Sequence, residues 1–136
     1  MSKSDQSGFR VLISDHNESQ RKPLAAYLAS KGCIVDETCS GSATWALLRS
    51  RPYDLVVLEM ELRDVNGLEL LRLMRRLNPS PLALLVADWK TEAVERMALA
   101  LGAEDFFVKP YELADVHSLL IDRSRDIGDQ SAAAGS

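Results

Sequence analysis

The sequence of 136 residues contains little cysteine, no surplus of basic residues and no long apolar run. The two cysteines, Cys33 and Cys39, match no metal-binding spacing, so they indicate reduced thiols and no disulfide framework. The formal net charge of -4 argues against direct nucleic-acid binding, because phosphate recognition needs a basic face. No apolar run approaches the ~20 residues of a membrane span, and no signal peptide is present. The sequence therefore predicts a cytoplasmic protein that contacts neither nucleic acid nor membrane directly.

The length and composition predict a single domain. A chain of 136 residues that is 46% hydrophobic can bury one core and leaves no room for a second domain of ordinary size. The periodic part of the sequence runs from residue 9 to residue 124. We expect residues 1–8 to form a flexible N-terminal tail and residues 125–136, which close on Ser-Ala-Ala-Ala-Gly-Ser, to form a flexible C-terminal tail or linker.

Short apolar runs alternate with amphipathic segments five times along the chain. The runs predict strands that are buried on both faces of a parallel sheet, at Val11–Ile13, Ile34–Val35, Leu55–Leu58, Leu82–Val86 and Phe106–Val108. The intervening segments predict helices near Ser19–Ser30, Ser42–Arg51, Leu68–Leu77, Thr91–Leu101 and Glu112–Arg123. Right-handed crossovers then favour an α/β fold, a flavodoxin-like (βα)5 doubly wound parallel sheet of strand order 2-1-3-4-5. Its ligand site is expected at the carboxyl ends of strands 1 and 3.

Four short segments carry the most specific signal in the chain. They are residues 11–17 (VLISDHN), 54–59 (DLVVLE), 64–67 (DVNG) and 106–110 (FFVKP). In this order they resemble the receiver domain of bacterial two-component response regulators, and the resemblance runs from about Phe9 to Ile121. In that family the position of Glu59 is occupied by an aspartate that accepts a phosphoryl group from a histidine kinase. Glu59 therefore stands at the phosphoacceptor-equivalent position.

The resemblance also implies which residues would hold the family's magnesium ion. Two neighbouring acids after the first strand join the phosphoacceptor, and those two positions are Asp15 and His16. Magnesium prefers oxygen ligands, whereas an imidazole suits softer metals. Glu59 also carries its carboxylate one methylene further out than aspartate would. The acidic pocket of Asp15, His16 and Glu59 is therefore a degenerate magnesium site, and we expect no cofactor, with Mg²⁺ binding weak or lost.

Other family positions are partly retained. The resemblance places Lys109 at the phosphate-sensing lysine and Phe106 at the aromatic switch position, and it makes the peptide bond before Pro110 a candidate for the cis form. The hydroxyl residue that ends the fourth strand in the family corresponds to Val86 or to Ala87, depending on the direction of counting. Neither residue has a hydroxyl, so a hydrogen bond to a phosphoryl oxygen is lost.

The sequence also predicts where several individual side chains lie. We expect Glu59 and Lys109 to form an ion pair at a semi-exposed rim of the sheet. His117 is expected at the surface of the last helix, and Trp45 in the core. Trp89 follows the fourth apolar run in a polar loop, where it either contacts a partner or folds back over the acidic pocket.

These features predict a degenerate receiver, or pseudo-receiver, that is not an enzyme and that regulates through protein contacts without phosphorylation. The expected partner is a kinase, an effector domain or another regulator. Partner binding or homodimerisation is expected through the face formed by residues 91–101, 105–109 and 112–124. Two alternatives stay open, namely an unusual phosphoacceptor such as Asp64 and a small-ligand or metal sensor built on His16, Glu59 and Lys109.

Overall fold

The computed structural model of this chain describes residues 8–135, with side chains described as far as residue 124. Most of the predicted N-terminal tail, residues 1–7, lies outside the described residues. Gly8 lies inside them, and its backbone N–H donates to the carbonyl of Gly32 at 2.9 Å. None of the helices in the described range combines the length and apolar character that a membrane crossing needs.

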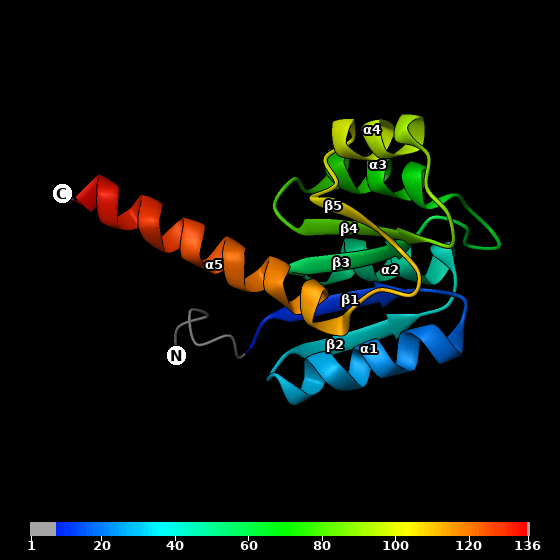
Figure 1. The fold of residues 1–136 in the computed structure, drawn as a ribbon, viewed down its shortest axis with the longest axis horizontal. Helices are drawn as coiled ribbons and strands as arrows, with labels where there is room; N and C mark the ends of the chain where they lie inside the picture. The colour runs from blue at the N-terminus through cyan, green and yellow to red at the C-terminus, as the bar shows by residue number, and fades with distance from the viewer. Residues whose placement is uncertain (1–7, 136) are drawn as a thin grey trace.

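Five strands alternate with five helices, as the sequence predicted (Figure 1). The strands are β1 (Arg10–Ser14), β2 (Ile34–Thr38), β3 (Leu55–Glu59), β4 (Leu82–Ala87) and β5 (Asp105–Val108). The helices are α1 (Glu18–Ser30), α2 (Gly41–Ser50), α3 (Gly67–Leu77), α4 (Glu92–Ala100) and α5 (Leu113–Gly135). The strands form one parallel sheet in the order β2-β1-β3-β4-β5, which confirms the predicted fold class and strand order.

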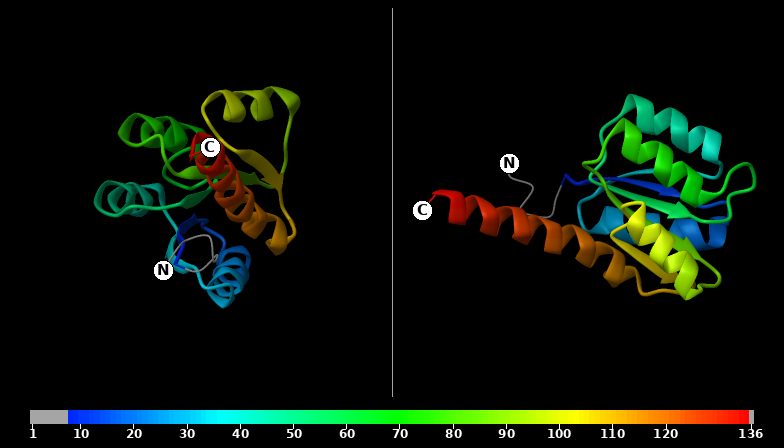
Figure 2. Two further views of the ribbon diagram at one scale, coloured as in Figure 1. Left: turned by 90° about the vertical axis from the view of Figure 1, so that its left-hand side faces the viewer. Right: turned by 90° about the horizontal axis from the view of Figure 1, so that it is seen from above.

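Helices cover both faces of the sheet (Figure 2). Leu24, Leu28, Val116 and Leu120 pack α1 and α5 onto one face. The other face carries α3 and α4, with α2 beside them, and the side chains that share this core come from Leu71, Met74 and Ala98 together with the partly buried Trp45. Helices lie on both faces because the strands are parallel. Each connection must cross back over one face of the sheet before the next strand starts.

Burial differs between the central strands and the edges. Every residue of β3 and β4 is buried. The expectation that all five strands are buried on both faces is wrong for the two edge strands, β2 and β5, where Ile34 is 47% exposed and Val108 37%. An edge strand has a neighbour on one side only, so its outer residues stay in contact with water. Trp45 was expected in the core, but it is half-buried, and the guanidinium of Arg49 lies 5.6 Å from its ring centroid.

The helix ends use local signals. Asn17 caps α1 by accepting a hydrogen bond from the backbone N–H of Ser19, and Ser40 caps α2 by accepting one from that of Ala43. Glycines follow α1 and α4 with positive φ angles, 89° at Gly32 and 98° at Gly102, which other residues rarely adopt.

The last helix is longer than predicted. The sequence analysis ended it at Arg123 and assigned residues 125–136 to a flexible tail, whereas α5 runs to Gly135. The added segment contains no proline and includes Ala132, Ala133 and Ala134, and alanine is the best helix former. Figure 1 shows this part of α5 extending away from the sheet.

Candidate functional site

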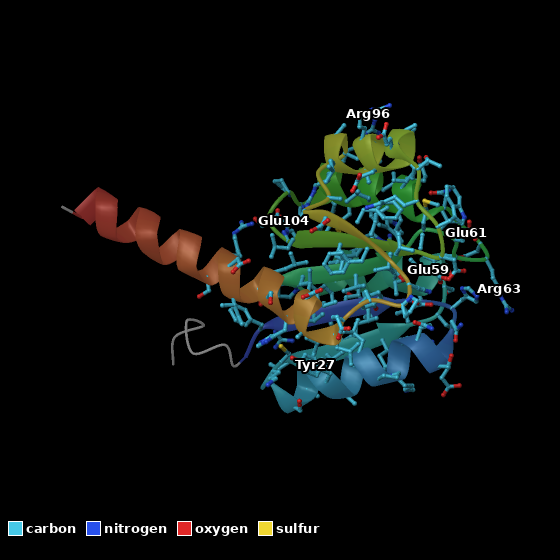
Figure 3. All side chains as sticks on the ribbon, viewed as in Figure 1. Tyr27, Glu59, Glu61, Arg63, Arg96 and Glu104 are labelled. Carbon is cyan, nitrogen blue, oxygen red and sulfur yellow. The ribbon has the colours of Figure 1, made fainter. Side chains whose placement is uncertain are left out.

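The predicted site residues meet at the carboxyl ends of the central strands. Asp15 follows β1, Glu59 is the last residue of β3, and Lys109 follows β5. Figure 3 shows Glu59 at this end of the sheet, close to the loop that carries Glu61 and Arg63. Asp15 and Glu59 are each 2% exposed, so both carboxylates lie in the interior.

Lys109 joins the two carboxylates. Its Nζ lies 2.8 Å from Oδ2 of Asp15 and 3.2 Å from Oε1 of Glu59. The predicted pair of Glu59 and Lys109 is therefore confirmed, but its expected position at a semi-exposed rim is wrong, because the Lys109 side chain is only 5% exposed. The reason is that Glu59 ends the middle strand of the sheet, which has neighbours on both sides.

His16 holds the other end of the Glu59 carboxylate. Its backbone N–H donates to Oε2 at 2.8 Å, and its ring nitrogen Nδ1 lies 2.6 Å from the same oxygen. The imidazole is half-buried, with 31% of its side chain exposed. On the neighbouring acid, Oδ1 of Asp15 accepts the backbone N–H of Asn17 at 2.9 Å. Each of the four carboxylate oxygens in the pocket therefore accepts at least one hydrogen bond from the protein.

Burial and neighbouring groups shift the pKa values of the three charged residues. Burial is the largest influence on Asp15 and raises its pKa, despite hydrogen bonds from Lys109 and Asn17. Burial also acts to raise the pKa of Glu59, but the hydrogen bonds from His16 and Lys109 outweigh it, so this pKa is lowered. Burial acts to lower the pKa of Lys109, and its two carboxylate partners outweigh it and raise that pKa. The Lys109 ammonium and the Glu59 carboxylate are therefore both held in their charged forms.

The donor set of the pocket does not fit a magnesium ion. One ligand atom from each of Asp15, His16 and Glu59 lies within 4.8 Å of the others, which is close enough for a shared cation. One of these three groups is an imidazole, which Mg²⁺ disfavours. The Lys109 ammonium also contacts both carboxylates and supplies one of the two positive charges that Mg²⁺ would bring.

Phe106 and the end of β4 lie beside this pocket. Phe106 is 2% exposed and shares a core cluster with Ala87, whereas Val86 belongs to the cluster on the opposite face of the sheet. This arrangement favours Ala87 as the position beside the switch aromatic. The backbone N–H of Lys109 donates to the carbonyl of Ala87 at 2.8 Å, and the peptide bond from Lys109 to Pro110 is cis, as the resemblance implied.

The sequence analysis missed two residues that surround Asp15. Arg21 in α1 donates from NH1 to the carbonyl of Asp15 at 2.9 Å and from Nε to Glu37 at the same distance. Tyr111 follows the cis peptide, and its burial, together with the charge of Asp15, raises the pKa of its phenol to about 12. Neither residue stands at a motif position in the sequence, so only the fold brings them to the pocket.

Asp64, the alternative phosphoacceptor, is engaged elsewhere. Its Oδ1 accepts the backbone N–H of Gly41 at 2.8 Å, and its Oδ2 accepts that of Ser42 at 3.0 Å. These two hydrogen bonds lower the pKa of the Asp64 carboxyl. Asp64 therefore ties the loop after β3 to the amino-terminal end of α2, where an anion is favoured by the helix dipole.

Trp89 lies in the loop after β4 and remains 44% exposed. Its Nε1 donates to Oε1 of Glu61 at 2.7 Å. This hydrogen bond links the loops that follow β3 and β4. Both loops lie at the carboxyl ends of the strands, where the pocket also lies. Of the two expectations for Trp89, the structure supports an exposed ring that remains available for contact, and it gives the ring an anchor on Glu61.

Comparison with known proteins agrees with this geometry. The model of the response regulator receiver domain matches residues 11–121. The TorCAD operon transcriptional regulatory protein TorR of Escherichia coli O157:H7 is 30% identical over 107 residues, which cover 78% of this chain and 45% of that protein. The transcriptional regulatory protein CusR of Escherichia coli K12 is 31% identical over 107 residues, covering 79% of this chain and 47% of that protein. The chain thus spans about half the length of the curated relatives it matches.

Solved structures share the fold. A CheY-like receiver domain protein from Methanospirillum hungatei superposes with a TM-score of 0.84 at 20% identity, covering 91% of this chain and 99% of the other. A two-component response regulator from Clostridium difficile gives a TM-score of 0.82 at 23% identity, covering 88% and 98%. The family match over most of the chain, the strand order and the gathering of Asp15, Glu59 and Lys109 lead to one conclusion. This chain belongs to the response regulator receiver domain family.

Proposed function

We propose that this receiver is a degenerate one, which signals through protein contacts and does not depend on phosphorylation of Glu59. The observation that carries the proposal is that the carboxylate oxygens of the pocket already accept hydrogen bonds from the protein. Lys109 lies between the carboxylates of Asp15 and Glu59, and His16 donates to the second oxygen of Glu59. The oxygens that would bind a metal ion already accept hydrogen bonds from the ammonium and from backbone N–H groups, so we expect weak Mg²⁺ binding or none.

The chemistry of phosphoryl transfer supports the same proposal. Such transfer depends on close alignment of nucleophile, metal and phosphorus, together with stabilisation of the developing charge. Glu59 is one methylene longer than aspartate, and both of its oxygens already accept hydrogen bonds. Ala87 has no hydroxyl to donate to a phosphoryl oxygen. Three requirements of the reaction are therefore weakened at once.

We expect no acyl phosphate when the protein is incubated with acetyl phosphate and Mg²⁺. Intact-mass measurement should show the unmodified chain. A matched variant that carries His16→Asp, Glu59→Asp and Ala87→Thr should gain a phosphoryl adduct under the same conditions, because it restores the acidic pair, the short nucleophile and the hydroxyl. An adduct on the wild-type protein that maps to Asp15, Glu59 or Asp64 would overturn the proposal.

The two alternatives have weaker support. A phosphoacceptor at Asp64 would have to give up the two backbone hydrogen bonds that hold it at the start of α2. A sensor for a small ligand or a soft metal would have to displace Lys109 from both carboxylates or His16 from Glu59. A thermal-shift screen with Zn²⁺, Ni²⁺ and Mg²⁺ tests the metal alternative, and we expect no shift with any of them.

We further propose that protein partners bind the face formed by α4, β5 and the first part of α5. Large apolar side chains are exposed here, with Met97 52% exposed, Leu99 46% and Val108 37%. Exposed apolar groups beside charges such as Arg96 have the composition of a protein interface. A second copy of the chain, a kinase, an effector domain or another regulator are the partners that this surface would take. The relatives are named as transcriptional regulators, and we propose that this domain influences such an output without touching nucleic acid itself.

Reversing two charges on this face should weaken the contact. We expect the variant with Arg96→Glu and Arg123→Glu to lose self-association or partner recovery by about tenfold or more, because like charges placed together across an interface cost several kcal/mol. Light scattering measures the homodimer, and pull-down measures other partners. Arg49→Glu, an exposed site on α2, is the matched control and should change neither. Equal association by all three proteins would show that the partner-binding surface lies elsewhere.

The cytoplasmic location of the protein stays a prediction.

A further inference from the structure

His117 lies in the interior, and the expectation that it lies at the surface is wrong. It belongs to α5 and is only 6% exposed. The position is explained by helical spacing, since His117 stands four residues after Leu113 and three before Leu120, on the stripe that faces the sheet. Its Nε2 is buried and has no hydrogen-bond partner among the described residues. A buried polar atom without a partner is rare and destabilises the closed packing around it.

The neighbours of His117 on α1 offer it no negative charge. The ring of Tyr27 meets the imidazole edge-on, with centroids 6.4 Å apart and an angle of 81° between the planes. Figure 3 shows Tyr27 on α1 below the start of α5. Nζ of Lys31, also on α1, lies 5.5 Å from the centroid of the same Tyr27 ring. The titratable and charged groups that face His117 from α1 are therefore a phenol and a cation.

The sheet side of this interface is mostly apolar, and carboxylates act on two of its members, Asp54 on the Cys33 thiol and Asp15 on the Tyr111 phenol. The core cluster that holds Val116 and Leu120 consists of apolar side chains together with the thiol of Cys33 and the partly buried rings of Tyr27 and Tyr111. Burial raises the pKa of the Cys33 thiol and of the Tyr111 phenol, so both stay neutral near neutral pH. A neutral imidazole fits these surroundings. An imidazolium would bring a second N–H donor and a charge into an apolar layer beside Lys31.

We propose that the α1–α5 interface is a proton-operated latch, in which uptake of one proton from solvent by His117 releases α5 from α1. When the helix is released, the imidazolium is exposed to water. Water then accepts the hydrogen bond for which the closed interface offers Nε2 no partner among the described residues. α5 is the last element of the fold and extends beyond the sheet (Figure 1), so its release changes how this helix stands relative to the rest of the domain. The inference does not depend on whether Glu59 can be phosphorylated.

The direction of the pH effect follows from the burial of the ring. Burial, with a smaller contribution from Lys31, lowers the pKa of His117 below its ordinary value. The closed interface therefore binds fewer protons than the open one, and its stability is complete above about pH 6.5 and declines as the pH falls below that value. The opening equilibrium shifts by up to tenfold for each unit by which the pKa in the closed form lies below the ordinary one.

Hydrogen exchange and NMR titration test the latch. In wild type, amides of α5 and of the facing turns of α1 should keep their protection above about pH 6.5 and lose it as the pH falls below that value, after correction for the intrinsic exchange rate, while amides of β3 and β4 keep theirs. The His117 ring resonance should titrate below the ordinary histidine pKa, over the same range. The chain has two histidines, so His16→Gln serves as the matched control and should leave the effect on α5 in place.

The variant His117→Leu should remove the pH dependence of α5 protection, and His117→Phe gives a second apolar replacement should the first one pack poorly. Equal loss of α5 protection in wild type and in either variant would overturn the proposal. So would an imidazolium at position 117 that forms while α5 and α1 stay fully protected, because the proton would then be accepted without release.

Discussion

Replacing Lys109 by methionine should destabilise the protein by about 3–5 kcal/mol, because it leaves two buried carboxylates without a cation. The side chains of Asp15 and Glu59 are each 3% exposed, so water cannot take over the role of the ammonium. Methionine keeps most of the aliphatic volume of lysine, and the loss therefore reports the charge. Urea unfolding at neutral pH measures the free energy of unfolding.

Between about pH 7 and about pH 5, the stability of this variant should depend on pH differently from that of wild type. Without Lys109, the two neighbouring carboxylates raise each other's pKa, and protonation of one of them relieves the repulsion. The stability of Lys109→Met should therefore rise as the pH falls from about 7 to about 5. In wild type the lowered pKa of Glu59 makes the contribution of this carboxylate complete above its ordinary value of 4.5, and this contribution declines only below that value. The raised pKa of Asp15 acts in the opposite direction.

Two controls accompany the Lys109 variant. Lys22→Met breaks a surface pair with Glu37, in which the lysine side chain is 55% exposed, and should cost less than about 1 kcal/mol. Adding Asp15→Asn and Glu59→Gln to Lys109→Met should restore most of the lost stability, since no unpaired charge remains. A loss from Lys109→Met as small as that from Lys22→Met would show that the pocket is far more hydrated than its burial indicates.

Gly67→Ala should be the second severe change, with a loss of about 3 kcal/mol or more. A Cβ atom at Gly67 would lie 2.4 Å from the carbonyl oxygen of Glu59 and 2.9 Å from Cα of Met60. Both obstacles are backbone atoms, and the backbone N–H of Gly67 already donates to the carbonyl of Met60 at 2.7 Å. The end of β3 would have to move, and Glu59 would move with it. Urea unfolding measures the loss, and the Glu59–Lys109 contact should weaken in a crystal structure.

Gly41→Ala offers a matched comparison because its obstacle is a side chain. A Cβ atom at Gly41 would lie 2.0 Å from Cγ1 of Val65. Trimming that side chain in a Gly41→Ala, Val65→Ala double variant should recover much of the stability that Gly41→Ala loses. For Gly67→Ala, no side-chain truncation removes the clash, so Val65→Ala should not rescue it. Rescue of both glycine variants by Val65→Ala would contradict the backbone origin of the Gly67 effect.

Several features of this fold could be predicted from local pattern. The period of apolar residues predicted five strands and five helices, and the rule for crossovers between parallel strands predicted their order, because both depend on neighbouring residues and backbone chirality. Asp15, Glu59 and Lys109 stand at the carboxyl ends of their strands, and this predicted that they lie together at one end of the sheet. Their pairing then followed, because the carboxyl ends of parallel strands meet.

Other features depend on contacts between segments far apart in the chain. Spacing along α5 places His117 on the stripe that faces the core. The contact of its ring with Tyr27 arises only when α1 packs beside α5, and Nε2 of His117 then has no hydrogen-bond partner among the described residues. The hydrogen bonds from Arg21 to the Asp15 carbonyl and from Trp89 to Glu61 likewise have no signal in the sequence. The sequence likewise does not mark where α5 ends, because the Ala-rich composition after Arg123 suits both a linker and a helix.

Local patterns in the sequence predicted the order of the elements and the end of the sheet at which Asp15, Glu59 and Lys109 gather. The packed fold adds three features that no local pattern indicates. Lys109 is buried between two carboxylates, Asp64 accepts two backbone hydrogen bonds at the start of α2, and Nε2 of His117 has no hydrogen-bond partner among the described residues. The physical reason is that periodicity and turn chemistry are local properties of the chain. Burial and hydrogen-bond partners depend on which distant segments cover a side chain once the core has formed.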